Sequence, residues 1–313
     1  MILTGYSKAL YSTGIYYSPL KTLYEAGEGI NTNMECRLVG IRNILLTHGH
    51  SDHYTGLINI LVTKFRYFHS SREFIPLTIF YAEGDNSLEG FIQYIKKHYR
   101  LNKRSDFDIT WVPLKPGTEE PLSSKRSTFV QTFATSHTSD VVSLGYNILE
   151  ERAKLRPEFM GLSPSQIGRL VREKGKNTIT YTSREMAVSY VGDCIPVDPS
   201  LIKGTRLLLH ESTFLREEDK EENSHSSLPE VLSLAKKARV GSLILYHLSS
   251  RYREKEIRTT LRQFRHEMKC TFPIYYIVPG KTFILDDLDK PSFQRLKTDS
   301  RLRDYGCKKY GNK

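Results

Sequence analysis

Short apolar runs alternate with amphipathic stretches along most of the chain. Runs of strand length occupy residues 41–46, 128–134, 186–191, 207–209 and 243–246. Apolar residues recur at helical spacing over residues 56–68, 87–99, 165–173, 228–238 and 253–268. Residues 2–44 and 179–191 instead have the pattern of hairpins. Because strands alternate with helices over most of the length, we predict a mixed α/β domain built in layers.

Each apolar run leads to a side chain that can bind a metal or carry a proton. The first run ends at Thr47 and is followed by a cluster of histidines at 48–53. The later runs lead in turn to His137, to Asp193, to His210 and Glu211, and to His247. One strand that ends in histidine is unremarkable. Five strands with such ends predict that the side chains converge on one rim of the sheets.

The cluster after the first run carries the strongest chemical information. His48, His50, Asp52 and His53 place three imidazoles and a carboxylate within six residues. This donor set favours zinc, with iron or manganese as substitutes. A zinc finger would need paired cysteines, and a helical metalloprotease site would need histidines four residues apart rather than two. A surface turn would leave these groups without the shared positive charge that holds them together, so we predict a site for one or two divalent metals.

Composition sets the broad class of protein. The 313 residues are 39% hydrophobic and 26% charged, as in soluble globular proteins. No run approaches the ~18 apolar residues of a membrane span, and the first residues lack the layout of a signal peptide. Four cysteines without a spacing motif predict reduced thiols and a cytoplasmic location. We expect one domain over residues 1–290 and a basic tail over 291–313.

The net charge of +11 and the sequence pI of about 9.3 indicate a polyanionic partner. Cations are concentrated at 96–104, at 152–176 and after 293. In the first of these segments Tyr99 stands among five cations and could stack on an unpaired base. A generally basic proteome is the alternative explanation. We predict that the cations of this first segment contact RNA phosphates: Lys96, Lys97, Arg100, Lys103 and Arg104.

The order of these groups resembles the ligand series of the metallo-β-lactamase superfamily. Further motifs narrow the resemblance to ribonuclease Z, the family of tRNA 3′-processing endonucleases, in its short form. They are Glu-Ala-Gly-Glu-Gly at 25–29, Ser-Leu-Gly-Tyr at 143–146, Val-Gly-Asp at 191–193, His-Glu-Ser-Thr-Phe at 210–214, His-Ser-Ser at 225–227 and the segment 243–252. The resemblance extends from about residue 5 to 283. It implies a four-layer αβ/βα sandwich of two mixed β-sheets flanked by helices.

The resemblance also implies a role for each candidate residue. His48, His50 and His137 would bind one zinc ion. Asp52, His53 and His247 would bind a second zinc ion, and Asp193 would bridge the two. Asp52 would also orient the attacking hydroxide or take its proton. Glu211 would hold His225 protonated, so that this imidazole could protonate the departing 3′ oxygen.

The family's activity is removal of the 3′ trailer of precursor tRNA, which gives a 3′-hydroxyl tRNA end and a 5′-phosphate trailer. By the same resemblance we expect a cytoplasmic homodimer that binds RNA and no membrane. An RNA 3′ exonuclease and a phosphodiesterase for small nucleotides are alternatives on the same fold, as are thiol-ester or β-lactam hydrolysis and a nucleic-acid-binding protein with an inactive site. The basic segments favour RNA, and the Glu211–His225 pair argues against a thiolate leaving group, which needs no proton.

Three features depart from the family pattern. The usual glycine-rich opening is absent, and Glu25 stands where the family usually has aspartate. The region between Gly145 and Asp193 lacks the Gly/Pro-rich composition of the family's projecting arm and resembles variants without one. We therefore expect the substrate to be held by 96–104, by 152–176 or by a partner subunit.

Overall fold

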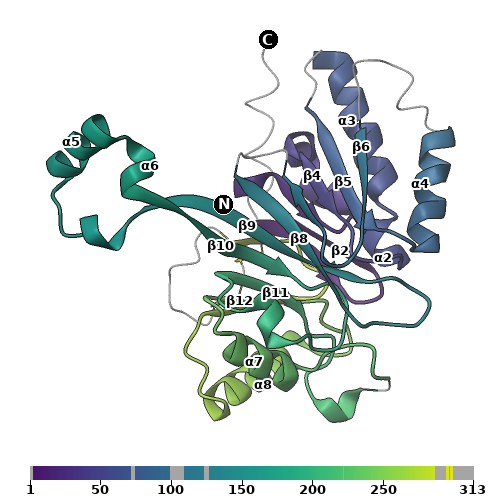
Figure 1. The fold of residues 1–313 in the computed structure, drawn as a ribbon. Coiled ribbons are helices and arrows are strands. Elements are labelled where there is room, and N and C mark those ends of the chain that lie inside the picture. Colours follow the sequence, from purple (N-terminus) through teal and green to yellow (C-terminus); the bar gives the residue numbers. More distant parts are fainter. Residues whose placement is uncertain are drawn as a thin grey trace.

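The computed structural model describes residues 3–71, 75–98, 109–122, 127–220, 222–285, 294–295 and 297–298. The strands in these ranges form two mixed sheets of eight strands each. The sheets pack against each other, and helices cover their outer faces (Figure 1). The predicted four-layer sandwich is therefore confirmed.

The first sheet combines an N-terminal hairpin with a parallel section. Its strand order is β16-β14-β1-β2-β3-β4-β5-β6, and the strands from β3 to β6 run parallel. The helices α3 (Leu57–Ser71) and α4 (Asn86–His98) bury their apolar faces against it, and α1 (Ile30–Met34) packs near its hairpin. The strands are β1 (Leu3–Lys8), β2 (Ser12–Tyr17), β3 (Thr22–Tyr24), β4 (Asn43–Leu45), β5 (Leu77–Ala82), β6 (Ile109–Leu114), β14 (Phe283–Leu285) and β16 (Lys297–Thr298).

The second sheet has an antiparallel half and a parallel half. Its order is β15-β13-β12-β11-β10-β9-β8-β7, with parallel pairing from β10 to β15. α7 (Leu228–Ala238) and α8 (Glu254–Glu267) cover it, and Ser227 with Glu230 forms the capping box that starts α7. The strands are β7 (Glu119–Pro121), β8 (Thr128–Ala134), β9 (Leu144–Leu155), β10 (Thr180–Tyr190), β11 (Leu207–Glu211), β12 (Leu243–Tyr246), β13 (Ile274–Tyr276) and β15 (Gln294–Arg295).

Three buried tyrosines join the two sheets. The rings of Tyr24 on β3 and Tyr190 on β10 stack with centroids 4.7 Å apart, and Tyr190 stacks on Tyr246 of β12 at 5.1 Å. All three side chains are fully buried. Because large aromatic rings supply much of the buried apolar area of a core, this stack fixes how the sheets meet beneath the strand ends.

β9 and β10 extend beyond the body of the sandwich as a projecting arm (Figure 1). They remain paired from Tyr146 and Tyr190 out to Leu155 and Thr180. The tip carries η3 (Pro157–Phe159), α5 (Pro164–Lys174) and α6 (Lys176–Ile179). The expectation that this region forms no arm is therefore wrong. The reason is physical: regular strands and a helix with its own capping box build this arm, so the Gly/Pro content of the family's arm is not needed.

The helices predicted from apolar spacing are all present, with ends shifted by a few residues at most. Four further short segments are η1 (Ser18–Leu20), η2 (Glu35–Gly40), η4 (Pro199–Ile202) and η5 (Glu217–Asp219). In the parts of the chain that the structure describes, no helix is both long and apolar enough to cross a membrane. Most of the expected basic tail lies outside the described residues, so its separation from the domain stays a prediction.

Candidate metal centre

The seven candidate ligands lie together at one end of the two sheets. His48 and His50 follow β4, and Asp52 and His53 lie in α2 (Ser51–Tyr54). The other three candidates follow β8, β10 and β12. Possible ligand atoms lie within 4.8 Å of one another in the group His48, His50, His137 and again in the group Asp52, His53, His247. The sequence prediction that these strand ends converge is confirmed.

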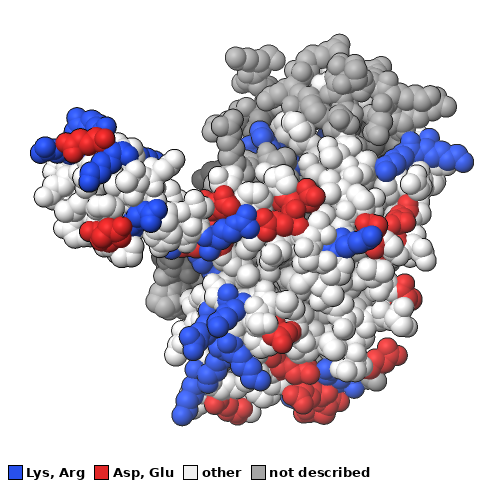
Figure 2. Space-filling model, viewed as in Figure 1, with Lys and Arg blue, Asp and Glu red and all other residues white. Residues whose placement is uncertain are grey.

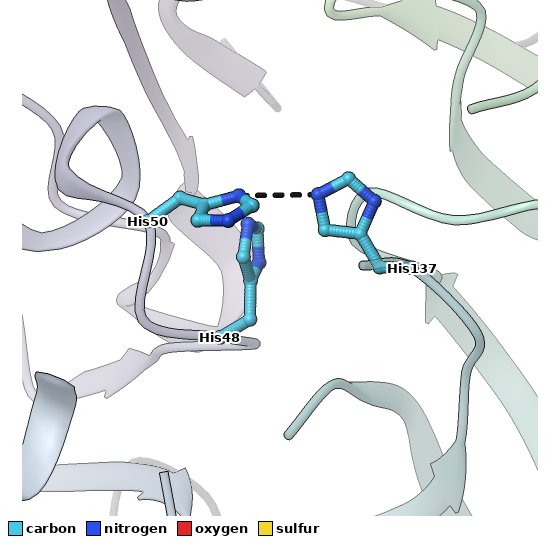
Figure 3. A group of neighbouring side chains, drawn as sticks. All are labelled: His48, His50 and His137. Carbon is cyan, nitrogen blue, oxygen red and sulfur yellow. Dashed lines mark hydrogen bonds between the residues drawn. The ribbon is translucent and has the colours of Figure 1, made fainter. Parts of the chain in front are cut away.

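Figure 3 shows the first group, in which His137 faces the two histidines from across the site. His137 Nε2 is 3.1 Å from His50 Nδ1. In the second group, His53 Nε2 and His247 Nε2 each lie 3.4 Å from Asp52 Oδ2. The same two nitrogens lie 3.2 and 3.1 Å from Asp193 Oδ2. Asp193 also shares a group with His137, so its carboxylate lies between the two clusters.

Several atoms of this site are buried without a hydrogen-bond partner. They are Nε2 of His48, both ring nitrogens of His53 and Oδ1 of Asp193. A buried polar atom without a partner costs about 1–3 kcal/mol, so four in one place would be expensive. Imidazole nitrogens and carboxylate oxygens are the ligands that zinc and related metals prefer. The residues therefore fit a site for divalent metal.

Neighbouring groups fix the orientation of three of the histidines. His137 Nδ1 donates to the carbonyl of Ser224 at 2.8 Å. Thr213 donates its hydroxyl to Glu211 and accepts from His247 Nδ1 at 3.0 Å, and Thr47 similarly donates to Glu25 and accepts from His48 Nδ1 at 2.8 Å. With the proton on Nδ1, each ring presents the lone pair of Nε2 to the centre. Such outer hydrogen bonds orient metal ligands and make them more basic.

Glu25, which replaces the family's aspartate, is part of this support. Its carboxylate is fully buried, accepts from Thr47 and lies 3.6 Å from His53 Nδ1. Burial raises the pKa of Glu25, and the neighbouring His53 imidazole and the hydrogen bonds from Thr47 oppose that rise. Its backbone has a φ of +59°, and that of His247 has +56°. Left-handed backbone costs a residue with a side chain about 1–2 kcal/mol, and such strain is concentrated at functional sites.

Glu211 and His225 form a pair beside the two ligand groups. Oε1 of Glu211 accepts from His225 Nδ1 at 3.1 Å and from the backbone of Ser226 at 2.8 Å. Burial lowers the pKa of His225, but the hydrogen bond and charge of Glu211 more than offset this and raise it to about 9. The His225 ring centroid is 4.7 Å from that of His137 and 5.4 Å from that of His247. A protonated imidazole therefore stands next to the centre.

His210 has a different position from its neighbour Glu211. It is fully buried, and its Nδ1 donates to the Glu211 carbonyl at 2.7 Å. Burial lowers the pKa of His210. We interpret it as a structural residue.

Sequence analysis did not single out three residues that support the site: Thr47, Thr213 and Asp85. Thr47 contacts His48, and Thr213 contacts Glu211 and His247. A threonine next to a histidine or a glutamate in the sequence is too common to predict such a role. Asp85 follows β5 as the candidate ligands follow their strands. Its place directly after a strand is the sequence feature that could have identified Asp85.

The predicted RNA-binding cations are only partly described. Lys96 and Lys97 are exposed in the last turn of α4, and Lys96 Nζ lies 5.4 Å from the centroid of the Trp111 ring. Arg100, Lys103 and Arg104 lie outside the described residues. Figure 2 shows Lys and Arg side chains gathered on the projecting arm, with fewer acidic ones among them. The exposed cations of the arm tip are Arg156, Arg169, Arg172, Lys174 and Lys176.

Comparisons with known proteins agree with this geometry. A family model described as a beta-lactamase superfamily domain matches residues 30–248. Ribonuclease Z of Sulfolobus acidocaldarius is 27% identical over 281 residues, which cover 82% of this chain and 88% of that protein. Ribonuclease Z of Pyrococcus abyssi is 30% identical over 260 residues, covering 75% and 79%. The crystal structure of human tRNase Z, short form, superposes with a TM-score of 0.58 at 19% identity, covering 92% of this chain and all of that one.

Proposed function

Because the chain belongs to the ribonuclease Z family of the β-lactamase superfamily, we propose that it is a zinc-dependent endoribonuclease that removes the 3′ trailer of precursor tRNA. One observation carries this proposal beyond the family. A largely buried cluster of imidazoles and carboxylates, with several ring nitrogens and one carboxylate oxygen left unpaired, lies next to His225, whose imidazole is paired with the buried carboxylate of Glu211. A metal-activated nucleophile and a proton for the leaving oxygen both accelerate the hydrolysis of a phosphodiester.

His48, His50 and His137 would hold one zinc ion, Asp52, His53 and His247 would hold another, and Asp193 would reach both. Two such cations lower the pKa of water enough to provide a nucleophile at neutral pH, and they neutralise charge on the phosphate. Manganese or iron(II) could replace zinc with the same donor atoms.

Asp52 is the residue we assign to the proton of the attacking water. Burial raises the pKa of Asp52, but the neighbouring imidazoles of His247 and His53 more than offset this, so its pKa lies below the usual value. The carboxylate is therefore ionised at neutral pH. It is partly exposed, which leaves it within reach of a substrate.

His225 is the proton donor in this proposal. Glu211 keeps the imidazole charged, and its ring remains partly exposed beside both ligand groups. A 3′ ribose oxygen is a poor leaving group unless it is protonated as the bond breaks. The same donor would be of little use against a thiol ester, which supports the assignment to phosphodiesters.

The basic surfaces supply the grip on RNA. We assign this role to the arm tip and to the cluster that begins at Lys96 and Lys97 and includes Arg100, Lys103 and Arg104. Neutralising phosphates releases counterions from the RNA, so the affinity should fall steeply with salt. Binding at sites remote from the scissile bond would select a large structured RNA over a single nucleotide. We also propose, from the family resemblance, a homodimer in the cytoplasm.

One experiment tests the function against its nearest alternatives. Purified protein is incubated with an end-labelled precursor tRNA, with bis-p-nitrophenyl phosphate and with a cyclic nucleotide, in the presence and absence of a chelator. We expect a single internal cut that yields a 3′-hydroxyl tRNA, restored by zinc after chelation. A ladder of shortened 3′ ends would instead identify an exonuclease. Turnover of the cyclic nucleotide alone would identify a small-nucleotide phosphodiesterase.

A further inference from the structure

Asp85 ties together the two loops that carry the first ligand group. It is almost fully buried, with 2% of its surface exposed. Its Oδ2 accepts from the backbone N–H of Gly49 at 3.0 Å and from that of Val142 at 3.2 Å. Gly49 lies between His48 and His50, and Val142 lies in the loop between β8 and β9 that carries His137. One carboxylate oxygen therefore bridges segments that are far apart in the sequence.

The packing around Gly49 shows how closely the first loop rests on this carboxylate. A Cβ atom at Gly49 would lie 2.1 Å from Asp85 Oδ1. Any residue other than glycine at this position would therefore push the Asp85 carboxylate away from its present place. The base of the other loop is closed by Thr135 N, which donates to the Ser143 carbonyl at 3.1 Å. The bond from Val142 N to Asp85 adds a second attachment to that loop.

The second ligand group is held by different bonds. The carbonyl of His53 accepts from Ala26 N at 2.6 Å, and the His247 N–H donates to Ser7 Oγ at 2.9 Å. These contacts connect it to β1 and to the segment after β3. Glu25 lies beside both halves of the centre, but the backbone contacts of Asp85 reach only the loops that carry His48, His50 and His137.

We propose that Asp85 is a positioning residue that sets the His48, His50 and His137 group in its metal-binding arrangement before metal arrives. The inference rests on the two-metal centre of the proposed function. Buried carboxylates that hold ligand-bearing loops act like other outer-shell partners, whose loss costs about 10–100-fold in metal affinity. Loss of Asp85 therefore weakens one of the two metal sites and leaves the other nearly unchanged.

The chain offers a variant that separates this role from simple helix capping. Oδ1 of Asp85 also accepts from Leu88 N at 3.0 Å and so caps the start of α4. Serine is an equally good N-cap but has no second oxygen for the loops. Asp85→Ser keeps the cap and removes the bridge, whereas Asp85→Ala removes both. Asp198 caps η4 through Ser200 N at 2.7 Å, away from the centre, and Asp198→Ser serves as the matched control.

Zinc titration against a chromophoric chelator tests the inference. We expect two tight sites in the wild type and in Asp198→Ser. In Asp85→Ser we expect one tight site and one weakened about 10–100-fold. Two unchanged affinities, or equal weakening of both sites, would overturn the proposal.

Amide hydrogen exchange on the metal-free protein gives a readout that does not depend on zinc. In Asp85→Ser the amides of Gly49 and Val142 should exchange faster, while those of α4 keep their protection. Unchanged exchange at both loop amides would contradict the role of Asp85. If the wild type itself binds fewer than two zinc ions, the two-metal centre fails, and the exchange result still decides whether Asp85 orders these loops.

Discussion

The metal centre and the projecting arm are both rich in charged residues, but they differ in how far these residues are exposed to solvent. In the centre, most charged and polar groups are buried, and outer hydrogen bonds orient several of the histidines. On the arm, ion pairs such as Lys154–Glu185 and Arg169–Glu173 are exposed to solvent. Exposed pairs contribute little to stability, about 0–1 kcal/mol, but they leave cations available to a partner. Our proposal therefore assigns the chemistry to the buried region and substrate recognition to the exposed one.

This contrast predicts that the two regions can be damaged separately. A change in the centre should affect every substrate, because all substrates need the same nucleophile. A change on the arm should affect only substrates large enough to reach it. Bis-p-nitrophenyl phosphate and precursor tRNA together distinguish the two cases.

Asp52→Ala should have the largest effect. Removal of a group that holds metal and takes a proton should lower kcat for both substrates by about 10³-fold or more. Binding of precursor tRNA, measured by filter retention, should be preserved because the basic surfaces are intact. Unchanged turnover would remove Asp52 from the mechanism.

His225→Ala should have the next largest effect on kcat, and the size of that effect should depend on the leaving group of the substrate. We expect kcat for precursor tRNA to fall about 10²-fold, because the 3′ oxygen leaves without a proton. Hydrolysis of bis-p-nitrophenyl phosphate should change much less, since p-nitrophenolate is stable unprotonated. Zinc content, measured by mass spectrometry, should stay at the wild-type value. Loss of zinc would instead assign His225 to the metal.

The dependence of kcat on pH should report the ionisation of His225. Since the pKa of His225 is raised to about 9, its acid form persists through neutral pH and is lost as the pH rises through that value. The kcat for precursor tRNA should therefore fall about tenfold per pH unit above it. The corresponding limb should be missing in His225→Ala. Contacts made by the arginines of the arm should not titrate in this range.

Neutralising the arm should have the smallest effect on chemistry. Changing Arg169, Arg172 and Lys174 to alanine should raise KM for precursor tRNA several-fold and leave turnover of the small ester unchanged. The slope of log affinity against log salt should decrease by about two. The control triple, Lys255, Arg258 and Lys269, removes three exposed cations from α8 and from the turn that follows it. Equal losses in both triples would mean that only net charge matters.

The two regions also differ in how much the sequence reveals. The centre could be predicted because metal ligands are rare residue types in a fixed order, and because strands of one sheet end on a common edge. His137 and His247 are separated by more than a hundred residues, yet strand ends alone bring them together. Their supports were not predictable in this way, since Thr47 and Asp85 act through hydrogen bonds that depend on the final packing of loops.

The sequence did not predict the arm because residues between Gly145 and Asp193 lack the Gly/Pro-rich composition of the family's flexible arm. Residues 150–155 carry four charges, which hide the pattern of a strand. The pattern at 179–191 predicts a hairpin, but these residues form the single strand β10, which pairs with β9. The backbone ladder between β9 and β10 pairs these strands along the arm, and cross-strand contacts such as Arg184 Nε to Glu151 Oε1 at 2.8 Å make a smaller contribution. Only the structure reveals which residues face each other.

The contact between Lys96 and Trp111 has a practical consequence. Trp111 is the single tryptophan of the sequence and lies in β6, at the edge of the first sheet. Selective excitation of tryptophan fluorescence therefore reports on this one position. An ammonium group that leaves the ring to meet a phosphate changes the electric field at the fluorophore. The protein thus carries its own optical reporter for whether the α4 surface takes part when RNA docks.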